Sequence, residues 1–261
     1  MTTIQDYIND TARSVAFLSR LPLPQRYFTG YDGRLSRAVR AFPLAGVIVT
    51  LPAAVLAALL SAAGAPPLLI AFAALTLVTL TTGALHEDGL ADCADGIGGG
   101  RDRDSALAIM KDSRTGSYGV VCLVLVFGLR AAAIAALVPA LTPSGLGMTL
   151  LAVGAASRAA MAWHWSRLPP ARREGVAASV GEPDGGAVLF ALASGILAAI
   201  LLTLPHVPLA ALVLALVLVI GVVLPFNRVV IGKIGGHTGD TIGATQQLAE
   251  AATLFALALA A

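Results

Sequence analysis

Charge is scarce in this chain: 12% of its 261 residues are charged and 57% are hydrophobic. A soluble globular domain carries about 25% charged residues, so the composition excludes an ordinary soluble enzyme and predicts an integral membrane protein. Two cysteines, Cys93 and Cys122, are too few for a disulfide framework. The N-terminus lacks the basic start and apolar core of a cleaved signal peptide. The net charge of +2 gives no reason to expect a nucleic-acid partner.

Apolar runs long enough to cross a bilayer recur along the chain, since a membrane helix needs about 20 apolar residues. The runs are 41–63, 67–85, 118–139, 146–163, 187–204, 208–224 and 242–261. The last run is the weakest, because it contains Gln246, Gln247 and Glu250. We therefore expect an all-α fold, a polytopic transmembrane helical bundle with about six to seven spans.

The segments between these runs are of two kinds that alternate strictly. The links near 64–66, 140–145 and 205–207 contain no charged residue, whereas 1–40, 86–117, 164–186 and 225–241 carry almost every charge. The positive-inside rule then places the charged segments and the N-terminus in the cytoplasm. The alternation also predicts an active site on the cytoplasmic face.

The chain divides into an N-terminal segment, residues 1–40, and a transmembrane catalytic domain, residues 41–261. Residues 4–21 are typical of an amphipathic helix, with Ile4, Tyr7, Val15 and Leu18 on one side. Such a helix is expected to lie on the cytoplasmic membrane surface. The sequence shows no internal repeat.

The stretch 86–116 holds seven of the 15 acidic residues and four of the 17 basic residues, beside hydrocarbon-length runs. Such dense charge is costly there unless something binds to it. Asp88, Asp92 and Asp95 are spaced i, i+4 and i+7, which puts them in one stripe on a helix. Three close carboxylates repel one another, and Mg²⁺, which prefers oxygen ligands and shares them with phosphates and water, removes that conflict. A solvated polar helix end is the alternative.

Basic residues follow the glycine run at 98–100, in a segment that predicts a short helix N-capped by Asp102 or Asp104. Lys111 and Arg114 are expected as i, i+3 neighbours near the C-terminal end of this helix. Arg101, Arg103, Lys111 and Arg114 are candidates to clamp substrate phosphates while Mg²⁺ bridges them. Ordinary juxtamembrane positive charge is the alternative, and for Arg101 and Arg103 the two interpretations stay open. Arg158, inside a span, either snorkels or meets an anion.

A glycine-rich turn precedes the last apolar run, G-G-H-T-G-D-T-I-G-A at 235–244. Backbone N–H groups around Gly239 would cradle a phosphate, and Asp240 would add a metal ligand or a base. Arg130 lies deep in a span, where a structural pairing or snorkelling is favoured over catalysis. The four histidines show no metal-ligand spacing.

The stretch H-E-D-G-L-A-D-C-A-D-G at 86–96 resembles the signature of the cobalamin synthases, the adenosylcobinamide-GDP ribazoletransferases. The resemblance continues in F-L-S-R-L-P-L-P at 17–24, F-P-L-A-G at 42–46, R-D-R-D at 101–104, I-M-K-D-S-R-T-G at 109–116 and the turn at 235–244. These segments follow the family's order across essentially the whole chain. The departures are Glu87, where Leu is common, and Ser117-Tyr118; neither removes a matched carboxylate.

The resemblance implies a transferase of the bacterial cytoplasmic (inner) membrane, in a late step of vitamin B12 biosynthesis. It joins adenosylcobinamide-GDP to α-ribazole or its 5′-phosphate, using Mg²⁺, and gives adenosylcobalamin or its phosphate plus GMP. A ribose hydroxyl attacks the phosphorus next to the cobinamide. Membrane lipid is an expected partner, and a homo-oligomer is compatible with the sequence.

The resemblance also implies roles for the candidate residues. The catalytic metal site is Asp88, Asp92 and Asp95, with one carboxylate as an acceptor for the hydroxyl proton. Lys111, Arg114 and Arg158 are assigned to phosphates, beside Arg101 and Arg103. Gly239 and Asp240 are assigned to the nucleotide or a second metal.

Three alternatives fit the sequence less well than this interpretation. A CDP-alcohol phosphotransferase also places Asp residues on membrane helices, but its pattern after D-G fits I-G-G-G-R-D-R-D poorly. A polyprenyl transferase needs a second D-x-x-x-D cluster, and 225–247 contains only Asp240. A transporter tends to place charge near the bilayer midplane, whereas here charge gathers at one face.

Overall fold

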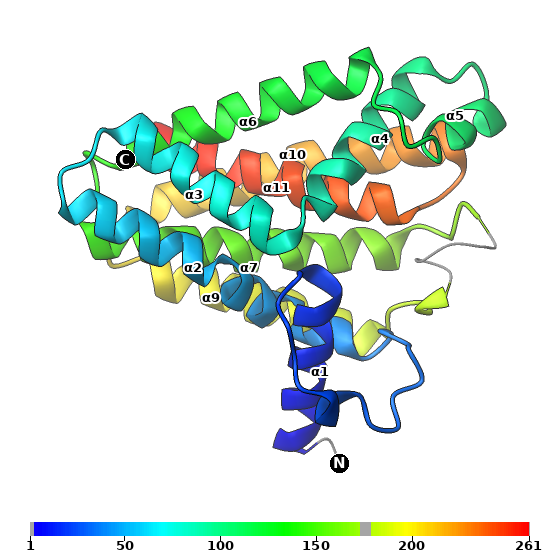
Figure 1. Cartoon of the computed structure of the whole chain (residues 1–261), viewed down its shortest axis with the longest axis horizontal. Helices are drawn as coiled ribbons and strands as arrows, with labels where there is room; N and C mark the ends of the chain where they lie inside the picture. The colour runs from blue at the N-terminus through cyan, green and yellow to red at the C-terminus, as the bar shows by residue number, and fades with distance from the viewer. Residues whose placement is uncertain (1–2, 173–178, 261) are drawn as a thin grey trace.

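The computed structural model describes residues 3–172 and 179–260, and within them the chain is a bundle of helices (Figure 1). The α-helices are α1 (Ile4–Leu18), α2 (Phe42–Ala62), α3 (Pro67–Thr82), α4 (Leu85–Gly99), α5 (Arg103–Ile109), α6 (Ser117–Leu137), α7 (Pro143–Arg167), α9 (Gly185–Thr203), α10 (Leu209–Ile234) and α11 (Gly239–Ala260). Two short 3₁₀ turns, Gln25–Phe28 and Ala38–Ala41, lie between α1 and α2. The all-α prediction is confirmed.

Five of these helices, α2, α6, α7, α9 and α10, are long and apolar enough to cross a membrane. The pair α3 and α4 passes the same test together, although the two helices are bent by 91°, so the described chain has five or six candidate spans. The predicted multi-pass bundle is therefore confirmed. The seventh predicted run forms α11, which is helical but is not among the candidates in the described residues.

The two kinds of connecting segment lie at opposite ends of the bundle. Figure 1 shows the α2–α3 link and the C-terminus at the left, and α5 with the α10–α11 link at the right. We call the second end, which carries the charged segments, the charged end. At that end α10 continues ten residues past the predicted limit of 224, through Pro225, to Ile234. Because a helix satisfies its own backbone hydrogen bonds, it need not stop where its apolar run stops.

The sharp bend between α3 and α4 places the acidic motif. Gly83 and Ala84 both have positive φ, 66° and 58°, a conformation that ends a helix and redirects the chain. The bend turns α4 against α11 and α6. A carboxylate-bearing helix is thereby packed beside the start of α11.

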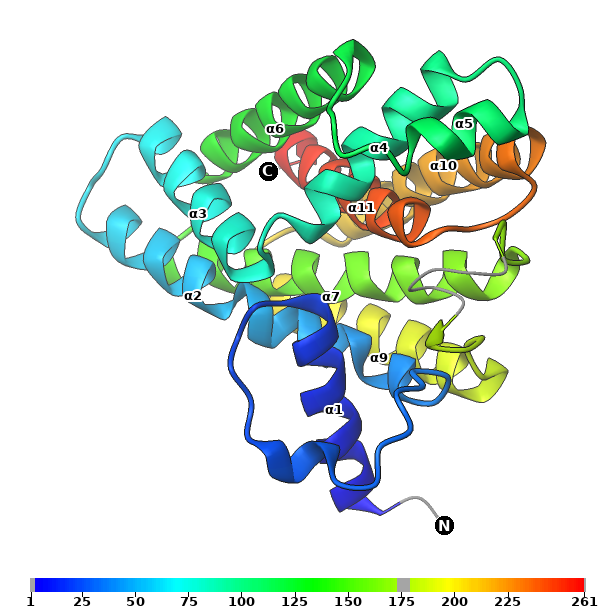
Figure 2. The same cartoon turned by 45° about the vertical axis from the view of Figure 1, so that its right-hand side comes forward.

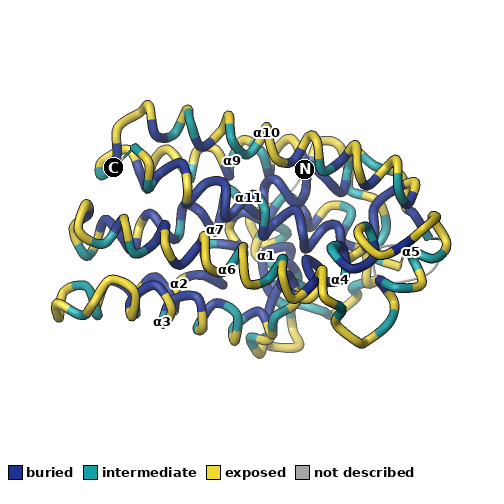
Figure 3. Tube along the Cα trace, turned by 90° about the horizontal axis from the view of Figure 1, so that it is seen from above, coloured by how far each residue is buried: buried dark blue, intermediate teal, exposed yellow. Residues whose placement is uncertain are grey.

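Two helices form the buried centre of the bundle. Figure 3 shows α7 and α11 largely buried, whereas α9 and α10 expose much of their surface. Alanine and glycine allow the close packing of α7: the position of a Cβ on Gly154 lies 2.9 Å from the backbone oxygen of Gly46 on α2.

The N-terminal segment packs on this bundle instead of standing apart. Leu18 of α1 shares a hydrophobic cluster with Phe42 of α2 and Trp165 of α7. The buried carboxylate of Asp10 pairs with Arg40 at 2.7 Å, which ties α1 to the second 3₁₀ turn. As a result, residues at and just after the end of α1, among them Phe17 and Arg20, line a cavity at the surface of the bundle.

Candidate active site

A cavity of about 480 Å³ opens among α1, α4, the segment after α7 and the start of α11. Its wall includes two carboxylates, Asp88 and Asp240, and two guanidinium groups, Arg20 and Arg172. Gly239, at the first position of α11, is part of the same wall. The cavity thus brings anionic and cationic groups together beside a helix N-terminus, where backbone N–H groups favour an anion.

The close approach of α4 and α11 creates this arrangement. A Cβ built on Gly89 would lie 2.8 Å from the backbone oxygen and 3.0 Å from the Cα of Asp240. Glycine at position 89 is therefore what lets Asp240 lie beside the acidic stripe. Asp88, Asp92 and Asp240 interact electrostatically with one another. In the described residues the side chains of Asp88 and Asp92 form no hydrogen bond or ion pair, and Arg172 is the cation that acts electrostatically on Asp92 against this repulsion.

Asp240 is held by a relay of hydrogen bonds from the core. The buried His164 ring contacts Asn227 Oδ1 at 2.6 Å and Thr241 Oγ1 at 3.0 Å. Thr238 N–H donates to Thr241 Oγ1, and Thr238 Oγ1 donates to Asp240 Oδ2 at 3.1 Å. His164 on α7 therefore anchors both α10 and the turn that presents Asp240.

The same turn positions Arg172. His237 N–H donates to Pro169 O, and Ala171 N–H donates to His237 O, so the segment after α7 pairs with the α10–α11 turn. Burial lowers the pKa of His237 to about 4, which makes its ring neutral at pH 7. Arg172 donates to Leu107 O at 2.6 Å and interacts electrostatically with Asp92 and Asp240.

Asp95, the third carboxylate of the predicted stripe, is engaged elsewhere. Its buried carboxylate accepts hydrogen bonds from Gly116 N–H at 2.7 Å and Gly119 N–H at 2.9 Å. These are unpaired donors in the first turn of α6, so Asp95 caps that helix from outside. The predicted role of Asp95 as a metal ligand stays a prediction.

Among the described residues, no group of three or more Asp, Glu, His or Cys side chains is arranged as a ready-made metal site. The donors that do gather are Asp88, Asp92 and Asp240, which are at least partly exposed. These oxygens suit Mg²⁺, which usually takes one or two protein carboxylates and completes its shell with phosphate oxygens and water. The chemistry of this donor set is thus compatible with a metal that shares its ligands with a substrate.

The predicted phosphate-binding residues around α5 fall into two groups. Arg103 is committed to backbone oxygens, donating to Ile234 O at 3.0 Å and to Ala171 O at 2.5 Å, which ties α5 to the site segments. Arg101 and Lys111 are exposed. Asp102 is the N-cap of α5, as predicted.

The end of α5 differs from its prediction. The helix stops at Ile109, so Lys111 and Arg114 lie in the loop beyond it and are not neighbours on a helix face. Arg114 instead forms a bidentate contact with Asp112, and hydrogen bonds from Arg114 lower the pKa of that carboxyl to about 2. The partner of Arg114 in the structure is therefore the carboxylate of Asp112, two residues earlier in the sequence.

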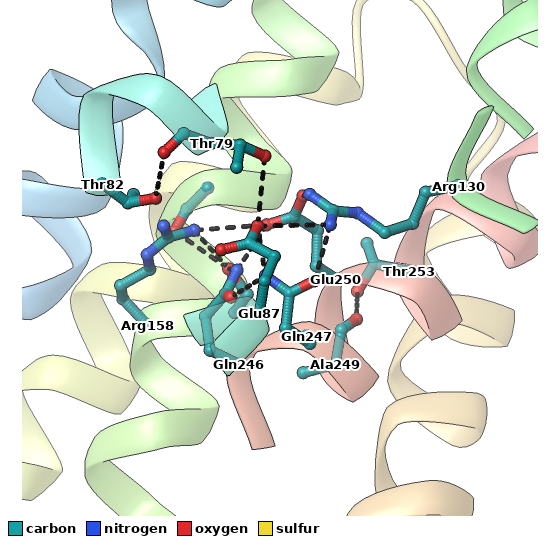
Figure 4. Close-up of polar contacts among 12 residues, drawn as sticks. Thr79, Thr82, Glu87, Arg130, Arg158, Gln246, Gln247, Ala249, Glu250 and Thr253 are labelled. Atoms are coloured by element: carbon teal, nitrogen blue, oxygen red, sulfur yellow. Dashed lines mark hydrogen bonds and ion pairs between the residues drawn. The ribbon is translucent and has the colours of Figure 1, made fainter. Parts of the chain in front are cut away.

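Arg158 lies deep in the bundle, in a buried network (Figure 4). It donates to Glu250 Oε2 at 3.3 Å, and Glu250 also pairs with Arg130. Gln247 joins this network to Glu87, whose Oε1 accepts its hydrogen bond at 3.0 Å. Of the two alternatives for Arg158, snorkelling or contact with an anion, the described chain shows contact with an anion, the carboxylate of Glu250. Arg130 forms the structural ion pair that was favoured for it over catalysis, also with Glu250. A role for Arg158 in binding substrate stays a prediction.

Arg20 and Arg172 line the cavity although their sequence pattern did not indicate them as site residues. Arg20 follows α1 within F-L-S-R-L-P-L-P, and its side chain lies against the turn at Gly83. Arg172 is one of two consecutive arginines in the segment after α7. The position of Arg20 inside a matched motif was the signal available for it, whereas nothing in the sequence distinguishes Arg172 from its neighbours.

We expect Gly89→Ala to reduce turnover by about tenfold or more while the protein still folds. The added methyl meets the backbone of Asp240, which cannot move aside as a side chain does, and a displacement of about 1 Å in a catalytic group costs up to about 10²-fold in rate. The measurement is kcat of the purified variant. Gly128→Ala on α6 is the control, because a Cβ there meets nothing within 4 Å. Equal kcat in both variants would show that the α4–α11 approach is not needed.

Comparison with known proteins finds relatives over the whole length of the chain. A family model described as cobalamin-5-phosphate synthase matches residues 10–258. Adenosylcobinamide-GDP ribazoletransferases of Sinorhizobium medicae and Rhizobium meliloti are each 60% identical to the chain, with full coverage of both sequences. A protein of the same name from Brucella anthropi is 42% identical, over 97% of each chain. No solved structure matches. The chain belongs to the cobalamin-5-phosphate synthase family.

Proposed function

We propose that this chain transfers the cobinamide phosphate of adenosylcobinamide-GDP to α-ribazole or its 5′-phosphate, with release of GMP. The observation that carries the proposal is the cavity at the charged end, where Asp88 and Asp240 face Arg20 and Arg172. A diphosphate donor needs cations for its oxygens, and an attacking hydroxyl needs a carboxylate for its proton. Full-length relatives named for this reaction support the same substrates.

Mg²⁺ is proposed as the cofactor, held by Asp88 and Asp92 with Asp240 available as a further oxygen ligand. When bound, the ion neutralises phosphate charge and orients the transferring group. Asp95, whose oxygens accept two backbone hydrogen bonds, is the least free of the predicted ligands. Phosphate oxygens of adenosylcobinamide-GDP would complete the coordination shell of the ion, which agrees with a site that has few protein ligands of its own.

The chain's own residues have distinct tasks in this reaction. Arg20 and Arg172 bind phosphate oxygens and stabilise the negative charge that spreads over them in the transition state. The N–H groups at the start of α11, near Gly239, bind the GMP portion. A carboxylate of the site accepts the proton of the ribose hydroxyl as its oxygen bonds to phosphorus and the bond to GMP breaks.

We also propose that the charged end faces the cytoplasm of a bacterial inner membrane. Basic residues of the α4–α6 segment, Arg172 after α7 and Lys233 in the last turn of α10 lie at that end, as the positive-inside rule requires. Soluble nucleotide substrates would then reach the cavity directly. Labelling of an engineered cysteine at Asp32 or Asp104 by a membrane-impermeant reagent, in intact versus opened cells, tests this orientation.

The direct test uses the purified chain in lipid vesicles with adenosylcobinamide-GDP, α-ribazole 5′-phosphate and Mg²⁺. We expect equal amounts of GMP and new corrinoid, and loss of both in EDTA. A parallel reaction with unphosphorylated α-ribazole compares the two acceptors. Folded protein that releases no GMP would overturn the proposal, and CDP-alcohols would then be the donors to screen.

Arg172→Gln is expected to raise KM for adenosylcobinamide-GDP by about tenfold, since a charged hydrogen bond contributes about 1.5–3 kcal/mol. Its effect on KM for the ribazole acceptor should be smaller, because the arginine is assigned to the donor's phosphates. Steady-state kinetics with each substrate varied in turn provides the measurement. Arg26→Gln is the matched control: Arg26 is exposed and stacks on Tyr27, away from the cavity wall.

A further inference from the structure

A second hollow, separate from the proposed active site, lies between α9 and α10. Its volume is about 540 Å³, and apolar side chains line nearly all of it. Small residues of α7, among them Ala156 and Ala160, form the floor, with Ile196 of α9 and Leu216 of α10 on the two sides. α7 packs closely against α9, whereas α10 packs mainly against α11, so the two sides stand apart (Figure 2). We call this hollow the α9–α10 groove.

The groove runs along the direction of the spans. On α10 it extends from Leu209, beside the uncharged α9–α10 link, to Leu224 near the charged end. Fifteen residue steps of helix measure about 22 Å, which exceeds half of a hydrocarbon core about 30 Å thick. α9 and α10 are also the least buried of the candidate spans. The groove is thus long enough for an acyl chain of one leaflet.

Two arginines flank the charged end of the groove. Arg167 follows Trp163, the last groove residue of α7, by four residues, and its guanidinium lies 5.9 Å from the Trp163 ring centroid. Arg228 follows Leu224 by four residues on α10, which places it one turn further on the same face. Both are exposed, and neither forms an ion pair within the described part of the chain.

These features match an amphiphile with one negative head and an apolar tail. Tryptophan and arginine at a helix end mark the headgroup level of a bilayer, and basic residues there attract anionic lipid. A helix from a second copy fits less well, because α2, α6, α9 and α10 contain no Asp or Glu to meet the two arginines.

We propose that the α9–α10 groove binds an anionic phospholipid of the bilayer. One acyl chain lies on the alanine floor of α7, and the phosphate lies between Arg167 and Arg228. Because this site is independent of the cavity at α4 and α11, the proposal stands or falls apart from the proposed reaction.

Native mass spectrometry of the full-length protein, released from nanodiscs of phosphatidylglycerol and phosphatidylethanolamine, tests the proposal. We expect retained phosphatidylglycerol, and an Arg167→Gln/Arg228→Gln variant should bind it about 10- to 30-fold more weakly. Ala156→Phe, which fills the floor, should lower retention of both lipids. Arg26→Gln/Arg34→Gln is the matched control, because both arginines are exposed and lie outside the groove.

Photoactivatable phosphatidylglycerol should crosslink to peptides of α7 and α10, which locates the lipid even if a variant folds poorly. Equal retention in the groove and control variants, or crosslinks confined to other helices, would overturn the proposal. A lipid-free dimer mass that becomes monomeric in Ala156→Phe would assign the groove to a second copy and would likewise overturn it.

Discussion

Asp92→Ala is expected to reduce GMP release by about 10²- to 10³-fold, the effect of losing one electrostatic group from a catalytic site, without loss of stability. Asp92 is half-buried between like charges and, in the described structure, has no hydrogen-bond partner to lose. Removing it relieves repulsion, so the thermal midpoint should stay equal or rise. The measurements are single-turnover GMP release at saturating Mg²⁺ and thermal unfolding in detergent.

Two companions separate a chemical role from a structural one. Asp95→Asn replaces one of the two carboxylate oxygens that accept from Gly116 N–H and Gly119 N–H with an NH₂ group, which cannot accept. One backbone donor of α6 is then left without its partner, so stability should fall by about 1–3 kcal/mol. Asp32→Asn, an exposed carboxylate of the N-terminal segment, should leave both activity and stability unchanged. Near-normal turnover by Asp92→Ala would falsify the assignment of the acidic stripe.

Glu250→Leu is expected to destabilise the fold by about 3–5 kcal/mol, because it leaves buried arginine charge uncompensated. The network of Figure 4 contains two guanidinium groups, Arg130 and Arg158, and two carboxylates, Glu87 and Glu250. Loss of Glu250 leaves one positive charge in excess. The readouts are the thermal midpoint, expected to fall by about 10 °C, and the yield of monodisperse protein.

The double variant Glu250→Leu/Arg130→Met tests charge balance directly. It leaves Arg158 and Glu87, one charge of each sign, so it should recover a large part of the stability lost in the single variant. Glu182→Gln, an exposed carboxylate, controls for a general effect of lowering negative charge. If the double variant is no more stable than Glu250→Leu, the network contributes through shape or hydrogen bonds and not through charge balance.

The buried network includes one residue of the acidic motif, Glu87, and excludes its neighbour Asp88. Glu87 and Asp88 are adjacent in sequence, yet Glu87 accepts from Gln247 in the core while Asp88 lines the cavity. The helix start after Gly83 turns these neighbours toward different surroundings. The extra carboxylate that distinguishes this motif therefore belongs to the bundle's interior, where it contacts α6 and α11 through Arg130 and Gln247.

Many of the helices could be predicted from the local pattern of apolar and charged residues. The apolar runs predicted α2, α6 and α9 to within about three residues, because burial in hydrocarbon demands an uninterrupted apolar helix and charge ends it. Helix signals also sufficed for α4, which ends at the glycine run, and narrowed the N-cap of α5 to Asp102 or Asp104, of which the helix uses Asp102. The predicted limit of α10 at residue 224 was wrong, because the helix continues beyond the apolar run, through Pro225, to Ile234.

By itself, the sequence determined which chemical groups this protein carries and on which helices they lie, since periodicity assigns a residue to a face of its own helix. Only the tertiary structure decided which groups meet. It directed Asp95 to the first turn of α6, paired Arg158 with Glu250, and brought Arg20, Arg172 and Asp240 to one cavity. The physical reason is that contacts between elements depend on the packing of residues such as Gly89 against a distant backbone, and no spacing within one helix encodes that partner.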